Sequence, residues 1–165
     1  MRGASAAKAT LVSNARGLLV IVPCGKAKVW DKRPDAGPTA ACDAYVGAPF
    51  RVNRKYAERF GDVWVILSAK YGFVRPNEAI PEPYDVTFKR RASHPVGVGT
   101  LRRQVRERGL DRFDEVVGLG GKEYRAAIEG AFAGSAVRLR FPFAGLALGP
   151  SMSATKGATE REAGS

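Results

Sequence analysis

The sequence predicts an α/β domain in which helices cover both faces of a mostly parallel, four-stranded sheet, giving a three-layer α/β/α arrangement. Short runs of branched apolar residues recur along the chain, helical apolar patterns separate them, and 165 residues suit one domain. We expect this domain to span residues 17–150. Residues 1–16, which carry only basic charges, and residues 151–165 are expected to be flexible tails, because both lack an apolar period.

Four segments are predicted to be strands. Leu18–Val22 and Val63–Leu67 are continuous apolar runs, which is typical of parallel strands that are buried on both faces. Glu115–Leu119 has the same character, whereas Ala136–Phe141 alternates between apolar and basic residues and is predicted to be a half-exposed edge strand. The spacing of the first two strands around a helix predicts that they run parallel.

Three helical patterns lie between or after these strands. The first starts at Pro49, carries apolar residues every four positions up to Phe60, and is stopped by Gly61. The second runs from Ser93 or Thr100 to Arg108, and the third covers residues 122–133. The sequence therefore alternates strands and helices, as a parallel sheet with crossover helices requires.

A connecting segment follows each predicted strand. These segments are residues 24–28, 68–72, 120–122 and 141–145, and the first three are polar and contain lysine. In a parallel α/β sheet, ligands bind beyond the carboxyl ends of the strands. The connection over residues 68–93 is also long and rich in proline, and a connection of this length is usually functional or mobile. We therefore expect the site at this edge.

The charge predicts a polyanionic partner. The chain has 27 Lys and Arg against 16 Asp and Glu, a net charge of +11. Nucleic acid, DNA or RNA, is favoured over a membrane surface because no basic amphipathic helix stands at a terminus. The basic stretch over residues 89–112 is expected to contact phosphates, through Arg102 and Arg106 among others. An arginine-rich composition is also typical of high-GC genomes, so the charge leaves a second explanation open.

The two cysteines, Cys24 and Cys42, form neither a disulfide framework nor a metal-binding spacing. We therefore expect no metal and no cofactor. The apolar run before Cys24 is too short for a signal peptide, which predicts a cytoplasmic location. Cys24 could be a nucleophile, because a nearby lysine lowers the pKa of a thiol, or a buried thiol at a strand end.

Several residues at the predicted edge are candidates for binding. The Gly120-Gly121-Lys122 turn precedes a helix, whose free N–H groups and dipole can hold a phosphate, although tight turns need glycine for their geometry as well. Lysines can grip phosphates, and tyrosines can stack on bases. The expected binding residues are Cys24, Gly25, Lys26, Lys28, Tyr45, Tyr71, Arg102, Arg106, Gly120, Gly121 and Lys122.

The candidate catalytic residues are Asp85, Ser68 and Lys70. Asp85 follows a proline and a tyrosine in a rigid loop, where a carboxylate could activate water or stabilise an oxocarbenium-like sugar during N-glycosidic cleavage. It could instead cap a turn. Ser68 and Lys70 resemble a serine–lysine pair, but residues two apart on a strand share a face without joining their tips. A phosphate contact is therefore favoured for Lys70.

Four motifs occur in a fixed order between residues 18 and 149: Pro-Cys-Gly-Lys-x-Lys at 23–28, Ala-Tyr-x-Gly-x-Pro-Phe at 44–50, Leu-Ser-Ala-Lys-Tyr-Gly-Phe at 67–73, and Pro-Tyr-Asp at 83–85. Together they resemble a bacterial and phage domain family of unassigned function. That family is distantly similar to peroxide stress proteins that bind DNA, and to uracil-DNA glycosylase-like domains of tRNA-modifying enzymes. The resemblance implies a glycosylase-like fold. The Asp-Pro-Tyr-His and His-Pro-Ser motifs of uracil-DNA glycosylases are missing, so their catalytic residues cannot be transferred.

The leading hypothesis is a nucleic-acid-binding protein with a glycosylase-like domain that acts as an N-glycosidase on a modified base in DNA or tRNA. One alternative is an enzyme that acts on a small nucleotide or phosphosugar at the same edge. Another is a non-catalytic interaction module of stress or phage origin. The three differ in what the polar segments at the strand ends do, so the structure of that edge is the place to compare them.

Overall fold

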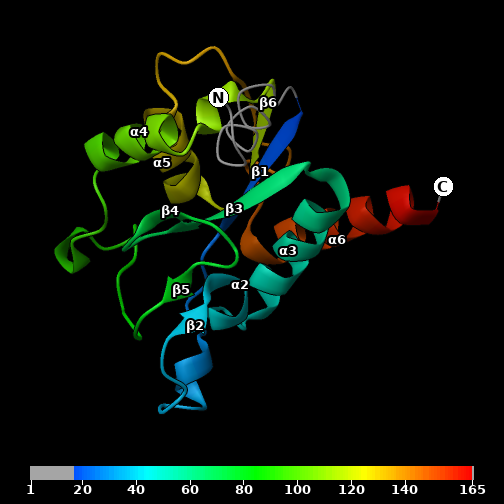
Figure 1. The fold of residues 1–165 in the computed structure, drawn as a ribbon. Helices are drawn as coiled ribbons and strands as arrows, with labels where there is room; N and C mark the ends of the chain where they lie inside the picture. The colour runs from blue at the N-terminus through cyan, green and yellow to red at the C-terminus, as the bar shows by residue number, and fades with distance from the viewer. Residues whose placement is uncertain (1–16, 165) are drawn as a thin grey trace, which may run out of the picture.

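The computed structural model describes residues 17–164, and the tail expected over residues 1–16 lies outside them. A mixed sheet forms the centre of the molecule, with strand order β4-β3-β1-β6-β7 (Figure 1). The five strands are β1 (Leu18–Pro23), β3 (Val63–Ser68), β4 (Gly72–Val74), β6 (Glu115–Gly118) and β7 (Arg138–Arg140).

Strand β1 lies in the middle and runs parallel to both β3 and β6, and β6 runs parallel to β7. Val20, for example, is level with Trp64 on one side and with Val117 on the other. The predicted parallel pairing of the first two strands is confirmed. The expectation of four strands is wrong, because β4 folds back after Ser68 and pairs antiparallel with β3. Its three residues are too few to show an apolar period.

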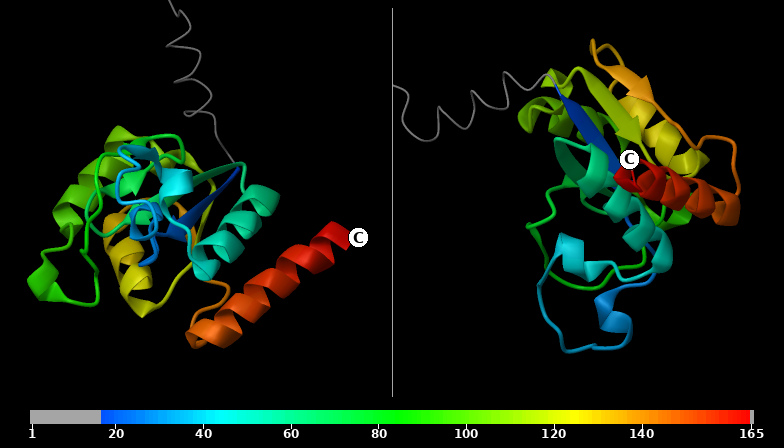
Figure 2. Two further views of the ribbon diagram at one scale, coloured as in Figure 1. Left: turned by 90° about the horizontal axis from the view of Figure 1, so that it is seen from below. Right: turned by 90° about the vertical axis from the view of Figure 1, so that its right-hand side faces the viewer.

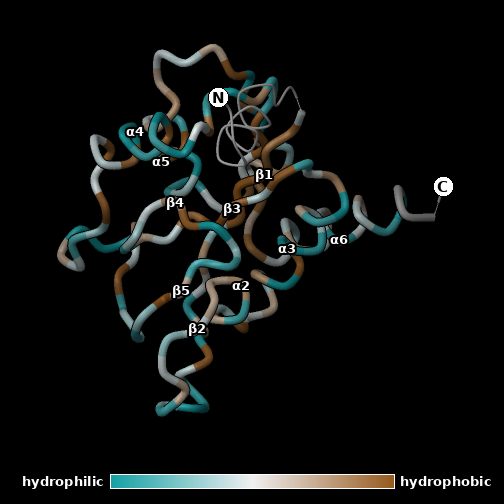
Figure 3. Tube along the Cα trace, viewed as in Figure 1, coloured by the Kyte–Doolittle hydropathy of each residue, from teal (hydrophilic) through white to brown (hydrophobic). Residues whose placement is uncertain are grey.

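The central strand is buried on both faces because its alternate residues enter two different cores. Val20 and Val22 belong to one cluster, and Leu19 and Ile21 belong to the other. Each is fully buried, which contributes about 1.5–3 kcal/mol per side chain. Figure 3 shows these apolar strands through the middle of the molecule and hydrophilic residues along the outer helices.

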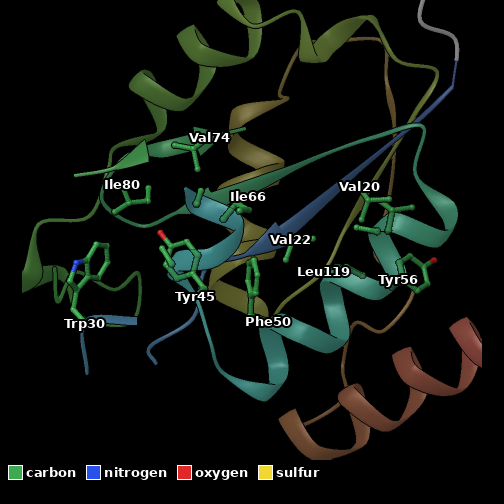
Figure 4. Close-up of a cluster of buried hydrophobic side chains, with 14 residues drawn as sticks. Val20, Val22, Trp30, Tyr45, Phe50, Tyr56, Ile66, Val74, Ile80 and Leu119 are labelled. Carbon is green, nitrogen blue, oxygen red and sulfur yellow. The ribbon is translucent and has the colours of Figure 1, made fainter. Parts of the chain in front are cut away.

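Two helices lie on each face of the sheet. Helix α3 (Ala48–Phe60) packs on one face with α6 (Leu148–Gly164), and α4 (Val98–Glu107) packs beside α5 (Lys122–Ala131) on the other (Figures 1 and 2). Pro49 in the first turn of α3 and Gly61 at its end agree with the predicted start and stop. In Figure 4, Phe50 of α3 lies between the helix and the strands, close to Val22.

The end of the chain differs from the expected tail, because residues 148–164 form α6. Thr155 is buried, and its hydroxyl donates to the carbonyl of Ser151. Ala158 packs against the core on the α3 side. Sequence reasoning missed this helix because its small residues produce no apolar stripe. Small side chains nevertheless allow two helices to approach closely, as α6 and α3 do.

A smaller substructure lies beyond the carboxyl ends of β1 and β3 (Figure 1). It contains an antiparallel pair, β2 (Thr39–Ala40) with β5 (Ala79–Ile80), and the one-turn helix α2 (Ala41–Ala44). Single 3-10 turns lie at Val29–Asp31, Arg91–Ser93 and Leu110–Arg112. Across residues 17–164, no helix has the length and apolar character needed to cross a membrane.

Candidate functional site

The loops after β1 and β3 are side by side at the carboxyl edge of the sheet. The backbone N–H of Cys24 donates to the carbonyl of Leu67 at 3.0 Å, which extends the parallel pairing by one residue. The loop after β6 joins them, because a side chain added at Gly120 would lie 3.1 Å from the ring of Pro23. The structure therefore brings together the first three of the polar segments that the sequence analysis placed at this edge.

Lys28, in the loop after β1, is buried at this edge, with 7% of its surface exposed. Its backbone N–H donates to the carboxylate of Asp31 at 2.8 Å, and its backbone forms an isolated β-bridge with Tyr45. Its ammonium donates to the carbonyl of Lys26 at 3.2 Å and lies 4.5 Å from the centre of the Tyr84 ring. The backbone contacts thus fix the ammonium in a place lined by aromatic rings.

A chain of three hydroxyl groups crosses the same place. The hydroxyls of Ser68 and Tyr84 are 2.8 Å apart, and those of Tyr84 and Tyr45 are 2.5 Å apart. Ser68, which is fully buried at the end of β3, also accepts the backbone N–H groups of Lys70 at 3.2 Å and Tyr71 at 3.0 Å. Ser68 therefore holds the turn after β3 and orients Tyr84.

Lys70 brings a second ammonium to the same aromatic rings. Its Nζ lies 5.3 Å from the centre of the Tyr71 ring and 5.8 Å from that of Tyr84. The two rings meet edge to face, with centroids 5.5 Å apart. Unlike Lys28, Lys70 is exposed. We call the residues Lys28, Tyr45, Ser68, Lys70, Tyr71 and Tyr84 the lysine–tyrosine cluster.

Gln104 of α4 ties the turn that carries Lys70 to the helical layer. Its side-chain nitrogen donates to the carbonyl of Tyr71 at 3.0 Å, and its side-chain oxygen accepts the N–H of Phe73 at 2.8 Å. Gly72 lies between these two residues with φ at +80°, a conformation that glycine adopts without strain. A single side chain of α4 therefore fixes the backbone on both sides of this glycine.

Cys24 contacts Tyr124. The hydroxyl of Tyr124 donates to the carbonyl of Cys24 at 3.2 Å and lies 3.2 Å from its sulfur. The ring of Tyr124 packs edge to face on Phe88, with centroids 5.3 Å apart. The residues Gly120, Gly121 and Lys122 are all exposed beside this contact.

Burial controls the ionisation of the cluster. It lowers the pKa of the Lys28 ammonium, and the opposing influence of Cys24, Asp31 and Asp85 does not restore the usual value. Burial also raises the pKa of the Tyr45 and Tyr84 hydroxyls, which stay protonated. Within residues 17–164, no carboxylate lies within 4.0 Å of either lysine ammonium in the cluster. The cluster therefore combines a buried amine, an exposed cation and neutral hydroxyls.

The structure does not bring Asp85 into the cluster. Its carboxylate is 85% exposed and pairs with Arg90 at 3.2 Å. An exposed carboxylate of this kind is well hydrated, so it lacks the shielded setting in which a carboxyl group is tuned as a general base.

Arg102 and Arg106 are exposed residues of α4. Arg102 donates to the carbonyl of Gly130 at 2.9 Å, which fixes its position on the surface. Loop residues that precede α4 approach the turn after β3, since the N–H of Val96 donates to the carbonyl of Ala69 at 2.8 Å. The loop before α4 and Gln104 within α4 thus both contact the segment that follows β3.

A cavity of about 230 Å³ opens beside Cys24, between the loop after β1 and the start of α3. The predicted binding residues Cys24, Gly25 and Lys26 line it, with Phe50 and Asn53 of α3 opposite. The described residues contain no group of three or more His, Cys, Asp or Glu that could hold a metal ion.

Sequence reasoning missed two residues of this edge, Tyr84 and Tyr124. Tyr84 stands next to Asp85 in the Pro-Tyr-Asp motif, where the carboxylate is the stronger signal for catalysis. Tyr124 lies on the apolar stripe of the helical pattern over residues 122–133, which predicts a core residue, but its hydroxyl reaches Cys24. A tyrosine in place of phenylalanine on an apolar stripe is the signal that indicates a polar partner.

The fold and the position of this cluster define an α/β protein whose candidate site lies at the carboxyl edge of a parallel core. The chain belongs to the family described as "Family of unknown function (DUF6884)", whose model matches residues 19–156. The expectation of a family of unassigned function is thereby confirmed.

One curated relative is "Uncharacterized protein YfjM" of Bacillus subtilis (strain 168), which is 47% identical over 110 residues, 67% of this chain and 73% of the relative. Among solved structures, "Crystal structure of AF0587, a protein of unknown function" matches 88% of this chain at 15% identity with a TM-score of 0.43. This chain spans 45% of that protein.

Proposed function

We propose that this protein binds nucleic acid and cleaves the N-glycosidic bond of a modified base, with the lysine–tyrosine cluster holding the target nucleotide. The observation that carries the proposal is the arrangement of two lysine side chains, Lys28 and Lys70, around the ring of Tyr84, with no carboxylate of the described residues within 4.0 Å of either nitrogen. Lysine nitrogens that lie near aromatic faces and form no salt bridge favour an anionic ligand, and phosphate is the anion that every nucleotide carries.

The aromatic members of the cluster suit a base next to that phosphate. Tyr71 and Tyr84 are both half-buried and meet edge to face, so part of each ring stays accessible. Stacking of a base on such a ring contributes about 1–3 kcal/mol. Lys70 lies between solvent and these rings, which is where the backbone of a bound strand would pass.

The charge outside the cluster supports a polymer rather than a single nucleotide. The net charge is +11, and Arg102 and Arg106 extend the cationic surface along α4. A mononucleotide held in the cluster would leave these arginines unused. Each phosphate of a bound single strand that the protein neutralises would add about 0.7 to the log–log salt slope of binding.

The glycosylase-like fold and the distant relationship to peroxide stress proteins are part of this proposal, as is a cytoplasmic location. The role first assigned to Asp85 is its weakest element, because that carboxylate is exposed and paired with Arg90. Groups that can reach a shielded sugar belong instead to the cluster. Ser68 and Tyr84 supply hydroxyls there, and Lys28 supplies a buried amine.

A second candidate function is an enzyme that acts on a small nucleotide or phosphosugar. The observation that favours it is the cavity beside Cys24, whose volume of about 230 Å³ is small and whose lining includes Lys26 and Asn53. A ligand confined to that cavity would not need the arginines of α4. Competition between mononucleotides and oligonucleotides therefore separates the two functions.

The test is fluorescence anisotropy with labelled single-stranded DNA and RNA oligonucleotides over a range of salt concentrations. We expect salt-dependent binding that the Lys70→Gln variant weakens, while Lys55→Gln, an exposed lysine of α3, serves as the matched control. Absence of salt-dependent binding to both polymers would overturn the proposal. Tighter binding of mononucleotides than of oligonucleotides would favour the second candidate.

Cleavage is tested separately, by mass spectrometry of bases released from a panel of modified DNA and tRNA. We expect release by the wild-type protein and retention of most of that activity in Asp85→Asn. Loss of base release in Asp85→Asn would return the carboxylate to the centre of the mechanism. Binding without any base release would restrict the proposal to recognition.

A further inference from the structure

Lys28 is unusual among the cations of this protein because it is the one that is buried, within residues 17–161. An ammonium has three N–H donors, and the carbonyl of Lys26 accepts one of them. The rings of Tyr84 and Tyr45 lie 4.5 Å and 6.0 Å from its nitrogen. These surroundings stabilise a positively charged Lys28 ammonium only weakly, because a ring face replaces only part of the hydration that burial removes.

The nearby carboxylates do not offset the hydration that the Lys28 ammonium loses on burial. The carboxylate of Asp31 accepts the backbone N–H of Lys28, so its closest contact is with the main chain rather than the ammonium. Asp85 is exposed and engaged by Arg90. Burial accordingly lowers the pKa of Lys28, which increases the fraction of neutral amine at a given pH.

A neutral, buried lysine amine is a nucleophile. Desolvation in an apolar place and a second cation nearby are the two ways in which proteins activate lysine toward carbonyl and related carbons. The first of these is found here, because Lys28 is buried and covered by aromatic rings, and Lys70 lies 5.8 Å from the centre of the same Tyr84 ring. Lys26, two residues earlier in the same loop, is exposed.

We propose that Lys28 is the catalytic nucleophile of this site and forms a covalent imine with the sugar of the target nucleotide. The inference rests on the function proposed above and supplies its chemical step. It also replaces Asp85-activated water by an amine that belongs to the cluster. No cofactor, oxidant or reductant is required for this reaction.

Atoms and electrons balance in this step. The lone pair of the Lys28 amine forms a bond to C1′ of the sugar while the bond from C1′ to the base breaks with its electron pair. The departing base gains one proton and the attacking nitrogen loses one, which leaves a neutral glycosylamine. The ring oxygen then takes up a proton and its bond to C1′ breaks as the sugar opens, giving a protonated imine between Nζ and C1′. Water hydrolyses that imine to the free amine and an abasic sugar, and the proton is released.

A sugar that approaches the Lys28 amine must pass Tyr84. This ring covers Nζ, is itself half-buried, and belongs to residues 81–90, which contain neither helix nor strand. Its hydroxyl is held by Ser68 and Tyr45, which come from two other segments of the chain. In this proposal the Tyr84 ring moves aside as the sugar enters, and Lys70 contacts the adjoining phosphate.

The experiment is reductive trapping on the full chain. Wild-type protein is incubated with a single-stranded DNA oligonucleotide that carries one abasic site, whose sugar presents an aldehyde, in the presence of sodium cyanoborohydride. The reductant converts an imine into a stable secondary amine. We expect a covalent protein–DNA adduct, and peptide mass spectrometry is expected to locate it on Lys28.

Two variants sharpen the result. Lys28→Arg keeps the positive charge but removes the primary amine, and we expect the adduct to fall more than about tenfold. Lys55→Arg removes an exposed amine of α3 outside the site and is expected to leave the adduct unchanged. Circular dichroism compares the folding of both variants with wild type. Because the adduct is mapped on wild-type protein, the test does not depend on Lys28→Arg being folded.

An adduct on Lys26, on Lys70 or on the N-terminal amine, with none on Lys28, would overturn the inference, and so would the absence of any adduct. Anisotropy on the same samples separates this failure from that of the proposed function. Oligonucleotide binding without trapping at Lys28 overturns the nucleophile alone. Loss of binding by the wild-type protein overturns nucleic-acid recognition as well.

Discussion

The loop after β1 and the loop after β6 both carry glycine and lysine at the same edge of the sheet, yet they place their lysines differently. Lys28, in the first, is 7% exposed and lies against Tyr84. Lys122, in the second, is exposed at the start of α5. The sequence motifs alone would rank the two loops equally as phosphate contacts.

The difference arises from the length and path of the connection after each strand. Residues 24–47 between β1 and α3 form a long connection, and its β-bridge between Lys28 and Tyr45 folds the loop inward. The chain after β6 enters α5 within four residues, so nothing folds over Lys122. The comparison teaches that a lysine after a strand becomes a buried amine only where a later segment of the chain covers it.

The largest expected effect is on nucleic-acid binding. Replacing Lys28 by Gln removes the buried amine from the cluster, and a hydrogen bond from that amine to a phosphate, which is a charged group, contributes about 1.5–3 kcal/mol, so affinity should fall about 10- to 100-fold. Replacing Lys122 by Gln removes an exposed cation that contributes at most about 1 kcal/mol. Anisotropy with the same oligonucleotide measures both. Equal losses of affinity in the two variants would contradict the expectation that the two lysines contribute differently to binding.

The second prediction concerns stability within the loop after β6. Gly120 has φ at +111°, and a side chain there would lie 3.1 Å from Pro23 and Tyr124, so Gly120→Ala should destabilise the fold by about 2 kcal/mol. Gly121 has φ at −79°, and a side chain there would make only an ordinary contact, 3.8 Å from the carboxylate of Glu123, so Gly121→Ala should change stability by less than about 0.5 kcal/mol. Urea unfolding compares them. A tolerated Gly120→Ala would show that the loop readjusts.

The third prediction compares two tyrosines that contact the loop after β1, Tyr84 and Tyr124. Tyr84→Phe leaves two hydroxyls, those of buried Ser68 and Tyr45, without their shared partner, and should cost about 1–2 kcal/mol. Tyr124→Phe removes one hydrogen bond to the carbonyl of Cys24 and a weak contact with its sulfur, and should cost about 0.5–1 kcal/mol. Thermal unfolding gives both values. A larger loss of stability in Tyr124→Phe than in Tyr84→Phe would contradict this prediction and show that the contacts at Cys24 contribute more to stability.

The smallest expected effect is the pH dependence that Lys28 contributes. Because its pKa is lowered in the folded state, the unfolded chain binds more protons between that pKa and the usual value of 10.5. The contribution of Lys28 to stability should therefore improve as pH rises through this interval, and wild type should gain relative to Lys28→Gln. The groups that face Lys28 and titrate or carry charge are Cys24, Lys26, Asp31, Tyr45, Lys70, Tyr84 and Asp85.

Tyr45, Tyr84 and Tyr124 act in the opposite direction at higher pH. Their raised pKa means that the folded chain keeps protons that the unfolded chain releases above about pH 10, so all variants should lose stability there. Urea unfolding at several pH values measures both trends, with Lys122→Gln as the matched control. Parallel curves for wild type and Lys28→Gln would contradict a lowered pKa at Lys28.

The sequence was sufficient for elements whose signal is local and apolar. The continuous runs at Leu18 and Val63 predicted the central parallel pair, and Gly61 marked the end of α3. It was insufficient where pairing partners decide the structure. Strand β4 has three residues, and α6 lacks an apolar stripe, so both depend on contacts with distant parts of the chain.

The same limit applies to the candidate site. The sequence motifs indicated the loops that carry Lys28, Ser68 and Lys70, because each follows an apolar strand. They did not show that Lys28 would be buried, since that depends on Tyr45 and Tyr84, 17 and 56 positions further along the chain. In the Pro-Tyr-Asp motif, Asp85 is a stronger candidate for catalysis than Tyr84. Only the folded structure shows which of these two neighbouring residues faces inward.

Gln104 links helix α4, which also carries Arg102 and Arg106, to the lysine–tyrosine cluster. Its side chain forms hydrogen bonds with the carbonyl of Tyr71 and the N–H of Phe73. In the proposed complex, phosphates bound to those arginines would contact the same helix that fixes the backbone beside Lys70. Binding at the outer surface of α4 would then alter the position of the turn that is proposed to hold the target nucleotide.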